Sequence, residues 1–170
     1  MTLPTKLTIS DDSGFLAIVN PGKYNSFVDE NWELPQLFNR FIEEMNNDNL
    51  IIRATGLENN WTVNFVAAPS DESSFREFSK TIKVTNNKLC LANYEDLTMT
   101  AQFRGETLPI KNHANLFIAL DNGNYEFTIR QLFDPNNEEY IAGNKTNFEV
   151  VVQSITRSES NKVEGIFWWQ

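Results

Sequence analysis

Hydrophobic and polar residues alternate with a period of two along most of the chain. The alternating runs are LIIRA (50–54), WTVNFVAA (61–68), FREFSKTIKVT (75–85), KLCLA (88–92), LTMTAQF (97–103), LFIAL (116–120), YEFTIRQLF (125–133), FEVVVQSI (148–155) and VEGIFWW (163–169). Successive side chains of a strand point to opposite faces, so this period predicts β-strands. Turns with Asn, Asp, Gly or Pro separate the runs, which predicts a two-sheet antiparallel β-sandwich or a small barrel.

One early segment, LPQLFNRFIEEM, has a helical period instead. Its apolar residues recur every three or four positions: Leu34, Leu37, Phe38, Phe41, Ile42 and Met45. Such spacing places them on one stripe of an amphipathic α-helix, which we expect over about residues 34–46. Pro35 suits a first helical turn, and the polar run NNDN is a plausible end.

Three short polar stretches indicate turns. Asp11-Asp12-Ser13-Gly14 separates KLTIS (6–10) from FLAIVN (15–20), so these runs are expected to pair as a hairpin. Asn86-Asn87 is a tight-turn candidate. Asn122-Gly123 can supply the positive φ angles of a tight hairpin turn. The strand after it should point Tyr125 inward as a core or corner tyrosine, leaving Glu126, Thr128 and Arg130 on the solvated face.

Composition limits the possible classes of protein. The 170 residues, of which 41% are hydrophobic, can form one β-sandwich domain over 1–170. The single cysteine, Cys90, excludes an internal disulfide, and no long apolar run or secretion signal is present, so a cytoplasmic location is expected. The net charge of −9 disfavours direct binding to nucleic acid and suits a basic protein partner.

Catalytic and cofactor motifs are absent from the sequence. The only base for nucleophilic catalysis is His113, and a dyad with Cys90 is less expected than a buried structural thiol. Two such residues are too few for zinc, and no glycine-rich phosphate loop occurs. We therefore predict no cofactor, no metal and no enzymatic activity, although an unrecognised carboxylate pair of a hydrolase stays open.

Acidic residues cluster in places that local structure does not require. Glu43 and Glu44 lie in the last helical turn, where the helix dipole disfavours negative charge, and Asp48 follows. Asp134, Glu138 and Glu139 lie in the longest irregular stretch. These six residues are the candidate partner-binding residues, together with Trp169, because one of the two adjacent tryptophans, Trp168 and Trp169, can be an exposed anchor.

The segments FSKTIKVTNNKLCLANYEDLTMTAQF and LFIALDNGNYEFTIRQL resemble the competence-protein J family, small acidic β-sandwich proteins that inhibit a DNA-entry nuclease. The likeness lies in the strand TIKVTNNKL and in the Gly-x-Tyr entry to the next strand, and TISDDSGFLAIVN and WELPQLF follow the same order. The resemblance implies a sandwich fold, no enzymatic activity and an acidic binding face. It transfers no individual site residue.

The leading hypothesis is thus a non-catalytic acidic protein, an inhibitor or immunity-type partner that occludes a basic effector such as a nuclease or toxin. The alternative is a β-sandwich that binds a carbohydrate or small ligand through Trp61, Trp168 or Trp169. A hydrolase ranks third, and a structural domain of a larger assembly is compatible with the same sequence.

Overall fold

The chain contains two β-sheets and two α-helices. The computed structural model describes residues 3–24, 32–103, 105–137, 145–156 and 161–169. The helices are α1 (Leu34–Asn46) and α2 (Tyr94–Gln102), with a short 3-10 turn, η1 (Lys111–His113). The strands are β1 (Thr5–Asp11), β2 (Phe15–Val19), β3 (Leu50–Ala54), β4 (Asn59–Val66), β5 (Arg76–Val84), β6 (Lys88–Asn93), β7 (Phe117–Ala119), β8 (Gly123–Gln131) and β9 (Phe148–Ile155).

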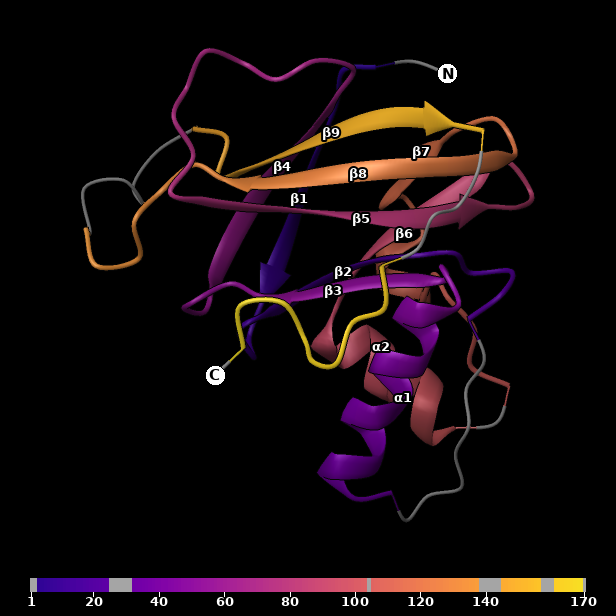
Figure 1. Cartoon of the computed structure of the whole chain (residues 1–170). Coiled ribbons are helices and arrows are strands. Elements are labelled where there is room, and N and C mark those ends of the chain that lie inside the picture. The colour runs from indigo at the N-terminus through magenta and orange to yellow at the C-terminus, as the bar shows by residue number, and fades with distance from the viewer. Residues whose placement is uncertain (1–2, 25–31, 104, 138–144, 157–160, 170) are drawn as a thin grey trace.

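The strands form a five-stranded sheet in the order β1-β4-β9-β8-β5 and a four-stranded sheet in the order β3-β2-β6-β7. All neighbouring pairs in these orders are antiparallel except β4 and β9, which are parallel. The sheets stack face to face, and both helices lie beyond the four-stranded sheet (Figure 1). The predicted mainly-β sandwich with an early helix is confirmed.

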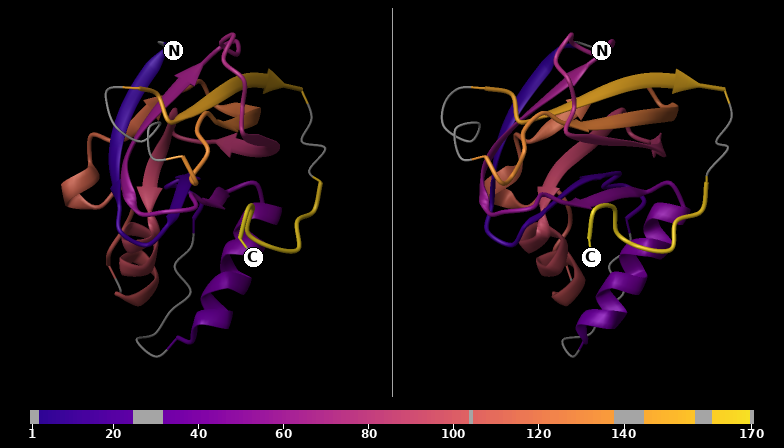
Figure 2. Two further views of the ribbon diagram at one scale, coloured as in Figure 1. Left: turned by 90° about the vertical axis from the view of Figure 1, so that its left-hand side faces the viewer. Right: turned by 60° about the vertical axis from the view of Figure 1, so that its left-hand side comes forward.

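The four-stranded sheet is the middle layer, and its strands β2 and β3 are buried on both faces. Leu16 and Ile18 of β2 point into the core between the sheets, whereas Ala17 and Val19 point toward the helices. Every residue of β2 and β3 is buried. This explains why β2 is a continuous apolar run, FLAIV, while strands of the five-stranded sheet, which has one solvated face, alternate. Figure 2 shows the same layers from two other sides.

Helix α1 has the bounds that its period predicted. Leu37, Phe41 and Met45 are fully buried against the middle layer. At its start the Gln36 side chain accepts a hydrogen bond from the Glu33 backbone N–H at 2.9 Å, as part of a capping box. The apolar stripe packs the helix against the sheet, and the capping box determines where the helix begins.

The prediction of a strand over 97–103 was wrong, because helix α2 occupies most of this segment. Asn93 and Asp96 form a reciprocal capping box, in which each side chain accepts from the other's backbone N–H at 2.9 and 3.1 Å. Leu97 and Ala101, one turn apart, are buried against the middle layer. The sequence signal was Asn-x-x-Asp at the start, which predicts a helix N-terminus more strongly than four alternating residues predict a strand.

The predicted hairpin of residues 6–10 and 15–20 is also wrong. β1 pairs with β4 in one sheet, and β2 pairs with β3 and β6 in the other. The Asp11 carboxylate accepts the backbone N–H groups of Ser13, Gly14 and Phe15 at 2.7–3.1 Å and so turns the chain between sheets. Gly14 has a φ of 79°, which a residue with a side chain rarely adopts.

The other two predicted turns connect the sheets as well. Asn86 and Asn87 both have a φ of 56° and join β5 to β6, which confirms a tight turn there. At Asn122-Gly123 only Gly123 has a positive φ, 152°, so this is a crossover from β7 to β8 and not the predicted hairpin. The Tyr125 hydroxyl donates to the Asp121 carbonyl at 2.7 Å, which confirms a buried corner tyrosine.

The last predicted strand, 163–169, is an irregular segment that crosses the edge of the sandwich. It begins beside α1, where Asn46 and the Val163 backbone exchange two hydrogen bonds, at 2.8 and 3.0 Å. It then meets β3 in a single parallel bridge between Arg53 and Phe167. Adjacent aromatic residues therefore lie at a sheet edge instead of within a sheet.

In the described part of the chain, no helix has the length and apolar character needed to cross a membrane.

Candidate functional site

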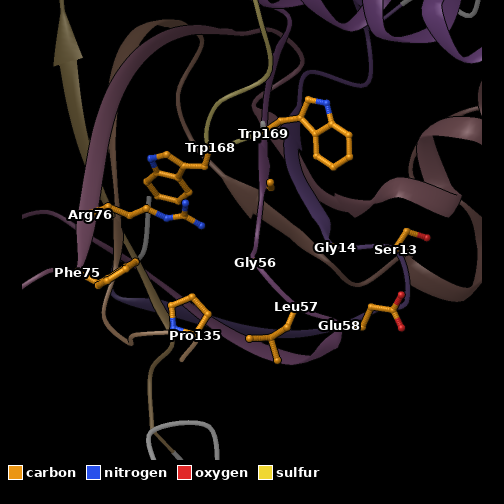
Figure 3. A pocket seen from close by; sticks show the side chains of 11 residues that line it. Ser13, Gly14, Gly56, Leu57, Glu58, Phe75, Arg76, Pro135, Trp168 and Trp169 are labelled. Atoms are coloured by element: carbon orange, nitrogen blue, oxygen red, sulfur yellow. The ribbon is translucent and has the colours of Figure 1, made fainter. Parts of the chain in front are cut away.

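An open groove of about 540 Å³ lies beside this C-terminal segment. We call it the Trp168 groove. Its walls come from five separate parts of the chain, and its main side chains are Leu57, Phe75, Arg76, Pro135, Trp168 and Trp169. Figure 3 shows the two indoles at separate positions along the groove, with Arg76 beside Trp168.

Arg76 is held in place from two sides. Its guanidinium carbon lies 4.2 Å from the ring centre of Trp168, a cation–π contact. Its Nε donates to the side-chain oxygen of Gln131 at 2.8 Å, and buried Gln131 in turn donates to the Phe133 carbonyl at 3.1 Å. Within the described residues, no carboxylate oxygen lies within 4.0 Å of Arg76. Partial burial lowers the pKa of Arg76.

The two tryptophans face different neighbours because the chain reverses between them. Trp168 has a φ of 63°, in the left-handed region that bulky residues rarely occupy. Its ring packs edge-on against Phe78, with centroids 4.9 Å apart. Trp169 packs against Phe15 at 5.1 Å and Phe38 at 5.8 Å, yet 51% of it is exposed. Trp169 is therefore the exposed member of the pair.

Asp134, one of the predicted partner-binding residues, lies next to the groove. It precedes Pro135, which lines the groove, and its carboxylate accepts the Asn136 backbone N–H at 2.9 Å. Asp134 and Trp169 thus belong to the same region of the surface, although their elements are remote in sequence. Glu138 and Glu139 lie outside the described residues.

The acidic residues around the end of α1 differ in exposure. The Glu43 side chain is 62% exposed and pairs with Arg40 at 3.0 Å. Glu44 is only 3% exposed, accepts from the Asn49 side chain at 3.0 Å, and has a pKa raised mainly by burial. Of this pair, only Glu43 presents a carboxylate to a partner in this conformation.

Asp48 has a structural contact. Its carboxylate accepts from the Lys80 ammonium at 3.0 Å and from the Thr81 hydroxyl at 2.8 Å. The Lys80 side chain is 2% exposed, so Asp48 neutralises a buried cation on β5. The backbone of Asp48 is left-handed, with a φ of 58°, which orients the loop toward this lysine.

Of the row of β8 predicted to be solvated, Glu126 and Thr128 are partly exposed, whereas Arg130 is buried, so the prediction for Arg130 was wrong. Arg130 forms ion pairs with Glu77 and with buried Glu149, whose carboxylate also accepts the Ser70 backbone N–H at 3.0 Å. Thr128 shares a hydrogen bond with Ser79 at 2.8 Å. Arg130 is therefore held by two carboxylates of the neighbouring strands and is not free to contact a partner.

The catalytic candidates weighed from the sequence occupy structural positions. Burial raises the pKa of the Cys90 thiol to about 11, the opposite of an activated thiolate. His113 Nδ1 lies 2.8 Å from the carboxylate of Asp96, which caps α2. Among the described residues, no group of three or more His, Cys, Asp or Glu side chains is placed to hold a metal ion.

Sequence reasoning did not single out Arg76, Phe75 or Arg53. Phe75 is 49% exposed, whereas Arg53 is fully buried behind the C-terminal segment, 4.5 Å over the ring of Phe148. Burial lowers the pKa of Arg53 to about 9; nearby Asp11 opposes this shift, and Arg76 adds to it. In a strand segment such as FREF, an arginine can point to either face of the sheet. The sequence therefore does not show that Arg76 lines a groove.

Two solved structures share the fold. Crocagin biosynthetic gene J matches with a TM-score of 0.56 at 12% identity, over 88% of this chain and 95% of that one. ComJ from Bacillus subtilis, described as the inhibitor of the DNA degrading activity of NucA, matches with a TM-score of 0.52 at 11% identity, over 89% and 96%. Neither a protein-family model nor a curated protein sequence matches the chain. The resemblance to the competence-protein J family is thus confirmed at the level of the fold.

Proposed function

We propose that this chain is a non-catalytic, acidic binding protein that inhibits a basic effector, such as a nuclease or toxin, in the cytoplasm. The observation that carries the proposal is the fold shared with ComJ over 89% of the chain, because that neighbour is described as a nuclease inhibitor. The net charge of −9 supports the same function, since a protein that binds phosphate backbones presents a basic surface.

The proposed mechanism is steric and electrostatic occlusion. Carboxylates would lie where DNA phosphates otherwise bind, and long-range attraction would raise the association rate at low salt. The interface we propose includes the acidic residues Asp134, Glu138 and Glu139, and Trp169 as an aromatic anchor. Glu43 is a secondary contact at the end of α1. We leave Glu44 and Asp48 out of the interface because their carboxylates make internal contacts.

The test begins with capture of a partner by the tagged chain from host lysate, followed by elution in salt steps. The captured protein is then purified, and its DNA-degrading activity is measured with and without the chain. Inhibition at near-equal molar amounts supports the proposal. Activity that persists in excess chain excludes inhibition of that partner.

A matched pair of charge reversals locates the interface. Glu138→Lys with Glu139→Lys should weaken binding and flatten its dependence on salt, because two attractive charges become repulsive. Asp71→Lys with Glu72→Lys is the control, since it reverses two adjacent exposed acids between β4 and β5. If both double variants bind equally well, the loop does not belong to the interface.

The second candidate function is small-ligand binding at the Trp168 groove. The observation in its favour is the open hollow of about 540 Å³ with two indoles in its walls. Trp61 is not part of it, since that residue is fully buried and its indole N–H donates to Asp11 at 2.9 Å. A shift in tryptophan fluorescence with a small ligand tests this function separately from inhibition.

A further inference from the structure

The Trp168 groove combines an apolar wall with one cation that has no carboxylate partner among the described residues. Phe75, Leu57 and Pro135 supply apolar surface, and Trp168 and Trp169 supply indole faces or edges. Arg76 supplies the positive charge among the side chains that line the groove. A ligand that fits must therefore offer apolar area to most of the groove and acceptor atoms to one end.

The geometry of Arg76 favours a carboxylate as the acceptor group. Its Nε is already bonded to Gln131, and its ring contact with Trp168 fixes the guanidinium plane. Of its five N–H donors, four are on the terminal nitrogens, and these have no carboxylate partner in the described residues. A planar guanidinium with two free terminal nitrogens matches a planar carboxylate.

The remaining charges of the groove limit the ligand to a single negative charge. Glu58 also lines the groove, and Figure 3 shows it at the end opposite Arg76. A second negative group on the ligand would approach this carboxylate in a chain whose net charge is already −9. A phosphate dianion or a dicarboxylate is disfavoured for the same reason.

A sugar fits the walls less well than an aromatic acid. One face of Trp168 is covered by the guanidinium of Arg76, and its edge region contacts Phe78. Trp169 packs against Phe15 and Phe38 on part of its surface. The exposed Phe75 adds an aromatic ring near Arg76, at 5.9 Å from its guanidinium carbon. These surfaces suit a flat apolar group better than a hydroxylated ring.

We propose that the Trp168 groove binds an aromatic or other apolar group carrying one carboxylate, with the carboxylate paired to Arg76 and the apolar body against Trp168 and Phe75. This inference deepens the second candidate function and is independent of the inhibitor proposal. Two sources have this chemistry, a free aromatic monoacid and the C-terminal residue of a peptide.

The first experiment uses the unmodified protein. Phenylacetate and its neutral isostere phenylacetamide are titrated, and binding is followed by calorimetry and by the indole N–H signals of the four tryptophans in NMR spectra. Because a charge-assisted contact to Arg76 is lost in the amide, we expect phenylacetate to bind at least about tenfold more tightly. Equal affinities, or binding of the amide alone, would overturn the carboxylate assignment.

The second experiment places the site. Arg76→Gln should lower phenylacetate affinity about tenfold and leave phenylacetamide unchanged. Arg40→Gln is the matched control, since it removes an arginine of α1 that does not line the groove, and it should bind both compounds normally. Loss of affinity in Arg40→Gln but not in Arg76→Gln would refute the site.

A third comparison separates the two sources. A tetrapeptide ending in phenylalanine is tested with a free C-terminal carboxylate and with a C-terminal amide. Tighter binding of the free-acid peptide than of phenylacetate indicates a peptide terminus, and the reverse indicates a small monoacid. If no acid binds while a neutral ligand shifts the tryptophan signals, the small-ligand function stands and the carboxylate class is wrong.

Discussion

The corner around Asp11 and the groove around Arg76 each place a charged side chain against a tryptophan. The two charged groups differ in how many of their hydrogen bonds are made within the protein. Asp11 is buried and accepts hydrogen bonds from three backbone N–H groups, from Thr55 and from Trp61. Arg76 is partly exposed, and of its donors only Nε has a polar partner among the described residues. The charge at the corner stabilises the fold, whereas the charge at the groove is available to a ligand.

The difference shows why net charge alone does not identify a binding face. Asp11, Asp96 and Glu149 are buried and bonded to protein groups. These acids contribute to the formal charge of −9, but they do not contact a partner in this conformation. The exposed acids, such as Glu43, are the ones from which an interface can be built.

The largest effect is expected at the corner. Asp11→Ala should lower the free energy of unfolding by about 3–5 kcal/mol, because it leaves buried donors unbonded and removes a carboxylate whose charge stabilises buried Arg53. Denaturation by urea measures this. The exposed neighbour Asp12 is the control, and Asp12→Ala should change stability by about 0.5 kcal/mol or less. Similar losses in both variants would remove the distinction between the two acids.

A smaller loss of stability is expected at Asp48. Asp48→Ala should cost about 2–3 kcal/mol, because the buried ammonium of Lys80 loses its carboxylate. In the double variant with Lys80→Met, part of this loss should be recovered, since no buried charge is left. A double variant less stable than either single variant would contradict the assigned pair. Thermal and urea denaturation of all four proteins complete the cycle.

The pH dependence of stability should report on Glu44. Burial raises its folded-state pKa above the ordinary value of 4.5, so the folded protein favours the protonated form. The free energy of unfolding should therefore decrease as pH rises from about 4.5 through the folded-state pKa. Glu44→Gln should remove this part of the pH dependence and be more stable than the parent at neutral pH. Parallel pH profiles of the two proteins would show that Glu44 does not titrate this way.

The smallest effect is expected at the exposed end of α1. Glu43→Ala should change the free energy of unfolding by about 0.5 kcal/mol or less, because its pair with Arg40 is solvated. The same variant should weaken partner binding if Glu43 contacts the effector. Unchanged binding together with unchanged stability would limit the interface to the loop and Trp169.

Patterns within one element predicted the fold well, and contacts between elements account for what was missed. The stripe from Leu34 to Met45 gave α1, and FEVVVQSI gave β9 with its observed bounds. The first hairpin failed because alternation does not reveal that Asp11 turns the chain into the other sheet. The strand over 97–103 failed because the Asn93–Asp96 cap outweighed a short alternation.

The same limit applies to the candidate site. The adjacent tryptophans allowed for one exposed indole on a strand, and Trp169 is exposed, although it lies on an irregular segment. The groove itself needs Arg76, Pro135 and Trp168 to meet from three remote segments, which no local pattern encodes. The clustering of acids pointed to Glu43 and Glu44 alike, but burial of Glu44 depends on packing around α1 that the sequence alone does not give.

The most direct test of the proposed function is a titration of DNA degradation. The basic protein captured by the tagged chain is mixed with duplex DNA, and purified chain is added in increasing amounts at low salt. If the chain inhibits this partner, degradation should stop near one chain per partner molecule and resume at a salt concentration that separates the two proteins. Degradation that continues at its full rate in excess chain, under conditions where the two proteins remain bound, would contradict it.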